Sequence, residues 1–384
     1  MRIGVITFFN NGNYGSELQA YAMNSFLESH GHSVCFCKFR TRNLLIQALE
    51  MFRDRIEEQV LKYRYPEYAK MRAERQNSIK NAKRISPSLH KTISDFSTCH
   101  LHSALLPRTF YSPRLFDCWI CGSDQVWTAL KIPFQKERFL PRVPSEKKIA
   151  YAVSLGPDKT PDYFARKARR LIKEYHFLSF RENSGREYVK QAFGLDSELV
   201  LDPTMLVGSR FWEQAISKVC SLETPNSYGL CYFLGRIPDE YKALISKYNA
   251  NRKLLVLAYQ EDAEELGGVY VPANPLEFVK LVANAAFIFT DSFHGTVFSL
   301  LMKKDFLSFE RSHSSAMAQT NRLTGLLGQL GISDRFVVRG EDVSDNIKPL
   351  DYQLISGIIE EKRVESSRFL EDCLNKVSNT VRNE

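Results

Sequence analysis

The sequence lacks the features that mark membrane-spanning and secreted proteins. No stretch of about 18 uncharged apolar residues occurs in its 384 residues, so no membrane-spanning helix is predicted. The N-terminal stretch MRIGVITFF is typical of a first strand, because it has neither the long apolar core nor the small-residue cleavage site of a signal peptide. We therefore expect a cytoplasmic protein.

The sequence also lacks motifs for metals and nucleotide cofactors. Eight cysteines are scattered, and the CxxC pair Cys118 and Cys121 lies in an apolar run without a second CxxC or a nearby His pair. This pattern favours structural thiols over a zinc site or disulfides. The loop 9–16, between an expected strand at 2–8 and an expected helix at 17–29, has neither the dinucleotide fingerprint nor a P-loop lysine. We expect no cofactor and no bound metal.

Acidic residues are scarce in one segment. Residues 38–84 contain thirteen Lys and Arg but six Asp and Glu, so this segment carries +7 of the net charge of +8. Such a patch suits nucleic acid, anionic lipid or a phosphorylated substrate, and a solvated helical face explains it at least as well. An apolar stripe inside it suits a membrane surface, a partner subunit or, more commonly, its own domain: Leu44, Leu45, Ala48, Leu49 and Phe52.

Strands and helices alternate along the rest of the chain, which predicts parallel sheets covered on both faces. We expect an α/β protein with two Rossmann-like domains facing each other across a cleft. The first domain spans 1–208 and contains a basic helical insertion without strands at 41–104. The second spans 209–349, and a long C-terminal helix follows at 350–384.

The stretch 286–304 is central to the functional interpretation. Its composition predicts a buried strand at 286–290, a tight turn and a helix that begins near Ser292. His294 and Gly295 lie at that helix start, where open α/β sheets bind ligands. His294 suits proton transfer near neutral pH, and capping the helix or filling a core gap is an equally good interpretation.

Polar side chains follow two further expected strands. Asp124 and its neighbours come after a strand at 116–121, and Trp127 beside them offers a ring for stacking on a sugar. Arg181 ends a strand at 177–180, where it suits bidentate binding of a carboxylate or phosphate. The alternative for Arg181 is a surface ion pair with Glu182 or Glu187, which would contribute little.

Six groups of residues keep their order along the chain and together resemble one known family, the polysaccharide pyruvyl transferases. The resemblance runs from residue 3 to about residue 336 and leaves out the basic insertion and the C-terminal helix. The groups are Asn13-Tyr14-Gly15 with 18–22, the stretch 122–127, the stretch 149–152, Arg181-Glu182 with Asp202-Pro203-Thr204, the stretch 290–296, and Asn321-Arg322-Leu323.

This resemblance implies a GT-B-like fold and transfer of pyruvate from phosphoenolpyruvate, a co-substrate, onto two hydroxyls of one sugar, which forms a cyclic ketal. The product belongs to a bacterial surface polysaccharide, such as a capsule or exopolysaccharide. The implied catalytic residues are His294 as acid or base, Arg181 as an anion clamp and Asp124 as a second base. The implied donor-binding residues are Arg181, Ser292, Phe293, His294, Gly295, Asn321 and Arg322, and the implied acceptor-binding residues are Asn13, Tyr14, Gly15, Gln19, Ser123, Asp124 and Gln125.

One departure from the family pattern concerns the donor site. Many members carry Arg two residues before the His, and this chain has Ser292 there. We expect Arg322 to supply the missing positive charge from the following helix. The departure also leaves room for a different donor in this subgroup.

Two other functions compete with pyruvyl transfer. A GT-B glycosyltransferase with a nucleotide-sugar donor would use the same cleft, with Asp291 on the ribose. A basic adaptor acting through 41–104 is the second, but it leaves the polar residues at the strand ends unexplained. For an enzyme we expect a sugar acceptor, free or linked to a nucleotide or lipid, and no nucleic-acid partner. Contact of 41–104 with the inner face of the membrane and homo-oligomer formation are left open.

Overall fold

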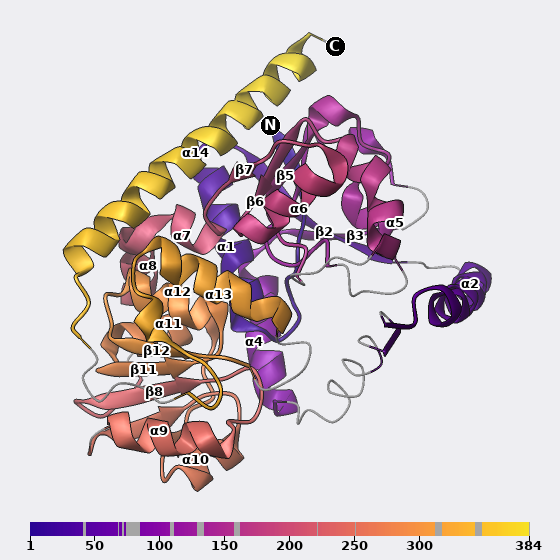
Figure 1. Cartoon of the computed structure of the whole chain (residues 1–384). Coiled ribbons are helices and arrows are strands. Elements are labelled where there is room, and N and C mark those ends of the chain that lie inside the picture. The colour runs from indigo at the N-terminus through magenta and orange to yellow at the C-terminus, as the bar shows by residue number, and fades with distance from the viewer. Residues whose placement is uncertain are drawn as a thin grey trace.

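The structure is a computed structural model of the chain (Figure 1). Among its helices, none in the part of the chain that is described is long and apolar enough to cross a membrane. The described residues are 1–40, 44–67, 69–70, 73, 85–107, 111–128, 134–156, 162–220, 222–249, 251–311, 317–341 and 348–383.

The first half of the chain forms a seven-stranded parallel sheet in the order β3-β2-β1-β4-β5-β6-β7. Its two central strands, β4 and β5, are buried at every residue, as their apolar runs predict. Strand residues point alternately to the two faces. The strands are β1 (Arg2–Ile6), β2 (Ser33–Arg40), β3 (Ser103–Pro107), β4 (Cys118–Cys121), β5 (Lys148–Val153), β6 (Phe177–Phe180) and β7 (Glu198–Leu199).

The second half forms a six-stranded parallel sheet in the order β10-β9-β8-β11-β12-β13. Each sheet is mostly buried and has helices on both faces (Figure 1). The predicted α/β class and GT-B-like arrangement are therefore confirmed. The strands are β8 (Tyr228–Tyr232), β9 (Lys253–Val256), β10 (Val269–Tyr270), β11 (Phe287–Thr290), β12 (Phe306–Phe309) and β13 (Phe336–Val337).

The helices pack in layers on the sheets. In the first half, α1 and α14 cover one face, and α5 and α6 cover the other. The α-helices among the described residues are α1 (Tyr14–Ser29), α2 (Leu44–Arg64), α4 (Pro87–His100), α5 (Asp162–Lys173), α6 (Asn183–Phe193), α7 (Pro203–Leu206), α8 (Gly208–Ser217), α9 (Asp239–Asn249), α10 (Gln260–Glu265), α11 (Pro275–Asn284), α12 (Phe293–Leu301), α13 (Met317–Gln329) and α14 (Tyr352–Arg382).

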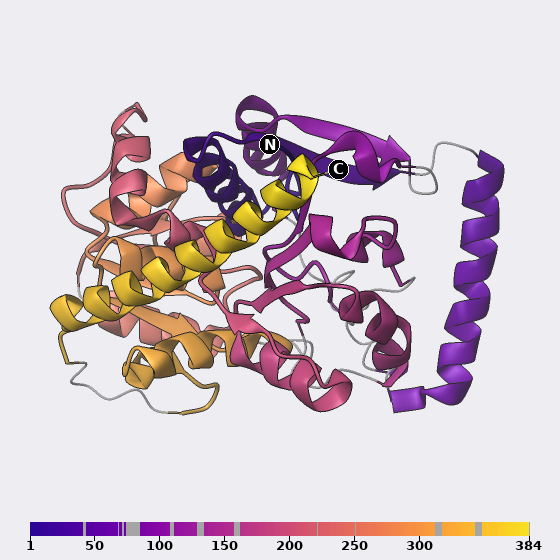
Figure 2. The ribbon, with the colours of Figure 1, turned by 90° about the horizontal axis from the view of Figure 1, so that it is seen from above.

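Helix α14 runs diagonally across the molecule from the second half back to the first (Figures 1 and 2). Its later apolar residues, Leu370, Cys373, Leu374 and Val377, are buried with β1, β4 and β5 of the first sheet. Its earlier residues Ile355 and Ile359 pack in the main core of the second half. One helix therefore holds both halves together.

Several local predictions need correction. Helix α1 begins at Tyr14 rather than at residue 17, because Asn13 caps it by accepting a hydrogen bond from the Ser16 amide. Strand β3 begins at Ser103, so the last residues of the expected helical insertion belong to the sheet. Trp127 is buried and stacks on Phe139, so its ring offers no exposed surface to a sugar.

Candidate active site

A buried cluster of charges forms at the ends of β4 and β6 and at the residue that begins α7. Arg181, directly after β6, donates through Nη1 to Asp202 Oδ2 and through Nη2 to Asp124 Oδ1, each at 2.7 Å. Asp202 also caps α7 and accepts from the Thr204 amide at 3.1 Å. Arg181 is buried, so its expected location in a surface ion pair was wrong, although its Nε atom does lie 3.7 Å from Glu182 Oε2. Asp124 and Asp202 hydrogen-bond the guanidinium, and these three carboxylates together compensate its charge.

His294 reaches the same cluster from the second half of the chain. It lies in the first turn of α12, whose N-cap Ser292 accepts from the Gly295 amide at 3.3 Å. The His294 Nε2 atom is 3.6 Å from Asp202 Oδ1. On its other side the ring touches Gly15 of α1, where an added Cβ would lie 2.0 Å from His294 Nδ1. Glycine is therefore required at position 15 for α1 and the His294 ring to approach so closely.

Arg322 of α13 is the second buried cation of the cluster. The Phe293 ring lies near both guanidinium groups, with its centroid 4.9 Å from Arg181 Cζ and 5.8 Å from Arg322 Cζ. Oriented with its oxygen toward Arg322, the Gln125 amide accepts from Nη1 at 3.3 Å and from Nη2 at 2.6 Å. Among the described residues, no carboxylate forms an ion pair with Arg322.

Burial and charge shift the pKa values of this cluster in different directions. Burial alone would raise the pKa of Asp202, but His294 and Arg181 hold it well below its usual range. The pKa of Asp124 is lowered in the same way, mainly by Arg181. Burial raises the pKa of Glu182. Burial and the neighbouring Arg181 cation lower the pKa of Arg322 to about 9. The positive charge of Arg322 is therefore poorly compensated, which favours an anion beside it.

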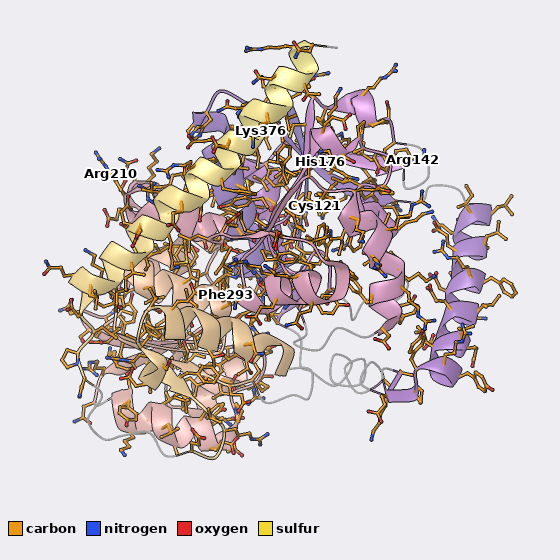
Figure 3. The ribbon with its side chains drawn as sticks, turned by 45° about the horizontal axis from the view of Figure 1, so that its top comes forward. Cys121, Arg142, His176, Arg210, Phe293 and Lys376 are labelled. Atoms are coloured by element: carbon orange, nitrogen blue, oxygen red, sulfur yellow. The ribbon has the colours of Figure 1, made fainter. Side chains whose placement is uncertain are left out.

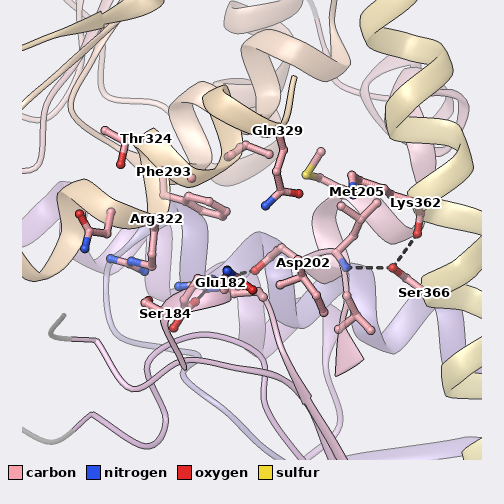
Figure 4. Close-up of a pocket in the computed structure, with 18 of the residues that line it drawn as sticks. Glu182, Ser184, Asp202, Met205, Phe293, Arg322, Thr324, Gln329, Lys362 and Ser366 are labelled. Carbon is pink, nitrogen blue, oxygen red and sulfur yellow. Dashed lines mark hydrogen bonds and ion pairs between the residues drawn. The ribbon is translucent and has the colours of Figure 1, made fainter. Parts of the chain in front are cut away.

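A cavity of about 310 Å³ opens beside this cluster, between the two halves and α14 (Figure 4). Arg181, Glu182 and Asp202 line it from the first half, and Phe293 and Arg322 line it from the second. Figure 3 places Phe293 where the halves meet. The lining of this cavity, as described, does not include His294 or Asp124.

Several buried polar atoms of the cluster have no hydrogen-bond partner among the described residues. They are Arg181 Nε, Glu182 Oε2, His294 Nε2 and Arg322 Nε. Unsatisfied buried polar atoms are rare in folded proteins, and a bound ligand is one way to satisfy them. No group of three or more His, Cys, Asp or Glu in the described part of the chain is placed to hold a metal ion. The two buried cations that line the cavity, Arg181 and Arg322, suit an anionic ligand.

Comparison with known proteins agrees with this ordered set of strand-end residues. A family model described as polysaccharide pyruvyl transferase matches residues 13–313, which is most of the chain. The chain belongs to the polysaccharide pyruvyl transferase family. The match includes every member of the buried cluster except Arg322. No curated protein matches the chain.

Two solved structures that resemble this family member are of epimerases whose names contain UDP-linked N-acetylglucosamine. A UDP-GlcNAc 2-epimerase from Neisseria meningitidis bound to UDP-GlcNAc has a TM-score of 0.50 at 9% identity, over 98% of this chain and 100% of that chain. The UDP-N-acetylglucosamine 2-epimerase from Rickettsia bellii has a TM-score of 0.47 at 13% identity, over 100% and 97% of the two chains. At such identities the first likeness shows the fold alone.

The residues expected to bind the donor lie at or next to the cavity. Arg181, Phe293, Asn321 and Arg322 line it. Two of the expected amide donors are already engaged: Ser292 N–H donates to Thr290 Oγ1 at 3.0 Å, and Gly295 N–H donates to Ser292 Oγ. Among the described residues, no side-chain acceptor is bonded to the Phe293 or His294 amide. Donor binding by all of these residues stays a prediction.

The residues expected to bind the acceptor make contacts within the protein. Tyr14 is buried and donates to the Ala273 carbonyl at 2.7 Å, which joins the two halves. Gln19 and Ser123 are fully buried, and Ser123 Oγ lies 3.0 Å from Asp202 Oδ2. Asn13 is the cap of α1. These residues position the cluster in this structure, and their contact with a sugar stays a prediction.

Sequence reasoning missed Asp202 and Glu182 as members of the site. Both stand in stretches that carry the family resemblance, but neither was given a role in the site. A capping Asp followed by Pro also begins a helix, and a helix start at a strand end is a ligand position. That signal would have added Asp202 to the candidates.

Proposed function

We propose that the protein transfers pyruvate from phosphoenolpyruvate onto two hydroxyls of one sugar and so forms a cyclic ketal. The observation that supports this most is Arg322, a buried cation without an ion-pair partner among the described residues, beside a cavity shared by both halves. Phosphoenolpyruvate brings a carboxylate and a phosphate, and either group compensates such a charge. Family membership supports the same reaction class.

Arg322 takes the place of the Arg that many family members carry at position 292. Its guanidinium and that of Arg181 lie near the same Phe293 ring, so two cations border one part of the cavity. Asp124, Asp202 and Glu182 each form an ion pair with Arg181. Among the described residues, Arg322 has no ion-pair partner, and the Gln125 amide oxygen is its hydrogen-bond acceptor. We therefore assign the stronger donor contact to Arg322, with Arg181 as the second.

In this reaction the methylene carbon of phosphoenolpyruvate gains a proton and becomes a methyl group. The neighbouring carbon is then attacked by one sugar hydroxyl, which loses its proton, and the bond from that carbon to the phosphate oxygen breaks. A second hydroxyl of the same sugar adds to this carbon and loses its proton. The products are a cyclic ketal and inorganic phosphate. Of the two hydroxyl protons lost, one balances the proton gained by the methyl group and the other leaves with the phosphate, so the reaction requires a proton donor and a proton acceptor.

His294 is the residue we assign to proton transfer. Its Nε2 atom is buried, has no hydrogen-bond partner among the described residues and lies 3.6 Å from the Asp202 carboxylate. That carboxylate is placed to orient the imidazole ring, which can carry a proton to or from a reacting group. Asp124 is the second candidate base, but its lowered pKa makes it a weak one. We expect His294 to protonate the methylene carbon or to accept a hydroxyl proton.

The test is calorimetric titration of phosphoenolpyruvate into the wild type and into Arg322→Gln. A charge-assisted contact contributes about 1.5–3 kcal/mol, so we expect the variant to bind the donor about 10- to 100-fold more weakly. The melting temperature of the variant should hold or rise, because a poorly compensated buried cation is removed. Arg339→Gln, at an Arg exposed over 53% of its side chain, is the matched control and should bind normally.

Unchanged phosphoenolpyruvate binding in a folded Arg322→Gln variant would contradict the donor site. If the wild type bound a nucleotide sugar saturably and did not bind phosphoenolpyruvate, the result would indicate a glycosyltransferase instead. The structure offers that alternative little support, since Asp291, the carboxylate expected on the ribose, is buried and accepts from the Leu234 amide at 2.8 Å. A panel of nucleotide sugars titrated in parallel separates the two donors.

A further inference from the structure

Helix α2 exposes an apolar stripe that the core of the protein does not cover. Leu49, Phe52, Ile56, Val60 and Tyr63 are exposed over 68%, 65%, 50%, 47% and 90% of their surface. Their spacing of three or four residues places them on one face of the helix. In Figures 1 and 2, α2 lies at the outer edge of the molecule. Exposed side chains of this size, aligned along one helix, are unusual for a surface in water.

The opposite face of α2 attaches the helix to the protein. Leu61 is buried against Tyr163 of α5. Glu57 accepts a hydrogen bond from the Tyr163 hydroxyl and lies 3.2 Å from Lys167 Nζ, also on α5. These contacts fix the rotation of α2 about its axis. The apolar stripe therefore points away from the protein rather than into a core.

Charged side chains are arranged in a regular way around this stripe. On a helix of 3.6 residues per turn, Arg55 and Lys62 fall along one border of the stripe. Arg53 and Arg64 fall along the other border, and all four are exposed. The acidic residues lie closer to the attached face: Glu50, Asp54, Glu57 and Glu58. Long basic side chains at both borders can bury their stems beside apolar groups and keep their charges in the headgroup layer.

We propose that α2 lies in the interface of an anionic lipid bilayer, with its apolar stripe among the acyl chains and its border arginines and lysine on the phosphates. Such a helix binds through buried apolar area and through attraction to anionic headgroups. Exposed basic residues also lie on α5, the helix that holds α2: Arg166, Arg169, Arg170 and Lys173. This inference does not rest on the proposed function, because it uses none of the residues at the cavity.

A second copy of the chain suits the stripe less well than a bilayer. If two α2 helices met along their stripes, the residues at the borders of one helix would face those of the other. Both borders carry basic residues, so like charges would meet, and the acidic residues that could pair with them lie closer to α5. Anionic lipid phosphates complement both borders at once.

The test is flotation of the full-length protein with vesicles, in the absence of substrates. One vesicle set is phosphatidylcholine alone, and the other contains about one third phosphatidylglycerol, each at about 0.05 and 0.5 M salt. We expect wild-type protein to float with the anionic vesicles, and less at high salt. Phe52→Glu should lower the vesicle affinity about tenfold or more. The matched control is Leu354→Glu, at a leucine on α14 that is 60% exposed, and it should float like the wild type.

Replacement of both border residues Arg55 and Lys62 by Gln should weaken binding to anionic vesicles several-fold and reduce its dependence on salt. The proposal is overturned if wild-type protein does not float with anionic vesicles, or if a folded Phe52→Glu variant floats as well as the wild type. A third result would also overturn it: the wild type does not bind vesicles, and sedimentation shows a dimer that the Phe52→Glu substitution dissociates. A second copy of the chain would then cover the stripe. Phosphoenolpyruvate binding should be the same in all these variants, so a failed donor site and a failed membrane site are told apart.

Discussion

At the scale of single residues, the centre of the cluster is one cation between two carboxylates. Arg181 is held by Asp124 and Asp202 at equal distances of 2.7 Å, and Asp202 in turn lies beside His294. Because these groups are buried, each one depends on its partners for compensation of its charge. Removal of one partner therefore costs more than the pair contributes when intact.

We predict that Asp202→Asn destabilises the protein by about 3–5 kcal/mol, the usual cost of breaking a buried ion pair. Urea unfolding at neutral pH measures this loss. The pKa of Asp202 is lower in the folded state than in the unfolded state, where it is about 3.9. The contribution of Asp202 to the free energy of unfolding is therefore complete above a pH of about 3.9, and it is lost as the pH falls through the folded-state pKa. The difference between wild type and variant should therefore be constant from about pH 8 to 5 and narrow below about pH 4.

A difference that changes between about pH 5 and 8 would contradict this assignment, because a group that titrates near neutral pH would then control the ion pair. Asp196→Asn is a suitable control, since the side chain of Asp196 is 91% exposed and forms only a surface pair with Lys190. Its effect on stability should be within about 0.5 kcal/mol at every pH.

The sequence indicates some residues of this cluster and not others, for a physical reason. His294, Arg181 and Asp124 each follow a strong apolar run, so the strand end that positions them is easy to predict. Asp202 follows the two-residue strand β7, whose pairing depends on β6 beside it. The 3.6 Å approach of Asp202 to His294 joins residues from different halves, and no pattern in a single sequence encodes that contact.

At the scale of elements, α14 contributes core residues to both halves of the molecule. Leu374 is 3% exposed and packs against the first sheet, whereas Leu354, near the start of the same helix, is 60% exposed. We predict that Leu374→Ala lowers the free energy of unfolding by about 2–5 kcal/mol, through lost burial and the cavity that remains. Chemical denaturation measures this loss, and Leu354→Ala should change the stability by less than about 0.5 kcal/mol. Equal effects of the two substitutions would mean that α14 does not dock on the first sheet in solution.

Elements with long apolar runs are predictable, and short edge strands are not. The strands β4, β5, β8 and β11 coincide with buried runs that the sequence shows directly. The strands β10 and β13 have two residues each and lie at the edges of their sheet. Their pairing is decided by the neighbouring strand rather than by their own composition. The early start of α1 depends on one capping hydrogen bond from Ser16 to Asn13, which residue type alone leaves undecided.

At the scale of the whole molecule, the cavity is shared by the two halves. Arg181 and Asp202 belong to the first half, and Phe293 and Arg322 belong to the second. The Tyr14 hydroxyl and helix α14 also join the halves, and Lys362 and Ser366 of α14 line this cavity. A ligand that contacts both sides of the cavity stabilises their arrangement, because it binds only when they are together.

We therefore predict that phosphoenolpyruvate at about 100 times its dissociation constant raises the free energy of unfolding by about 2.7 kcal/mol, in a single cooperative transition. Urea denaturation, followed by far-ultraviolet circular dichroism and by tryptophan fluorescence, measures this change. Trp119 and Trp127 report on the first half, and Trp212 packs against Phe298 of the second. Arg322→Gln at the same ligand concentration should show a smaller increase, of about 0.4–1.4 kcal/mol, since its donor affinity is about 10- to 100-fold lower. If the two probes separate and the ligand moves only one transition, then one half binds phosphoenolpyruvate alone. The proposed sharing of the donor between Arg181 and Arg322 would then be wrong, even if phosphoenolpyruvate is the substrate.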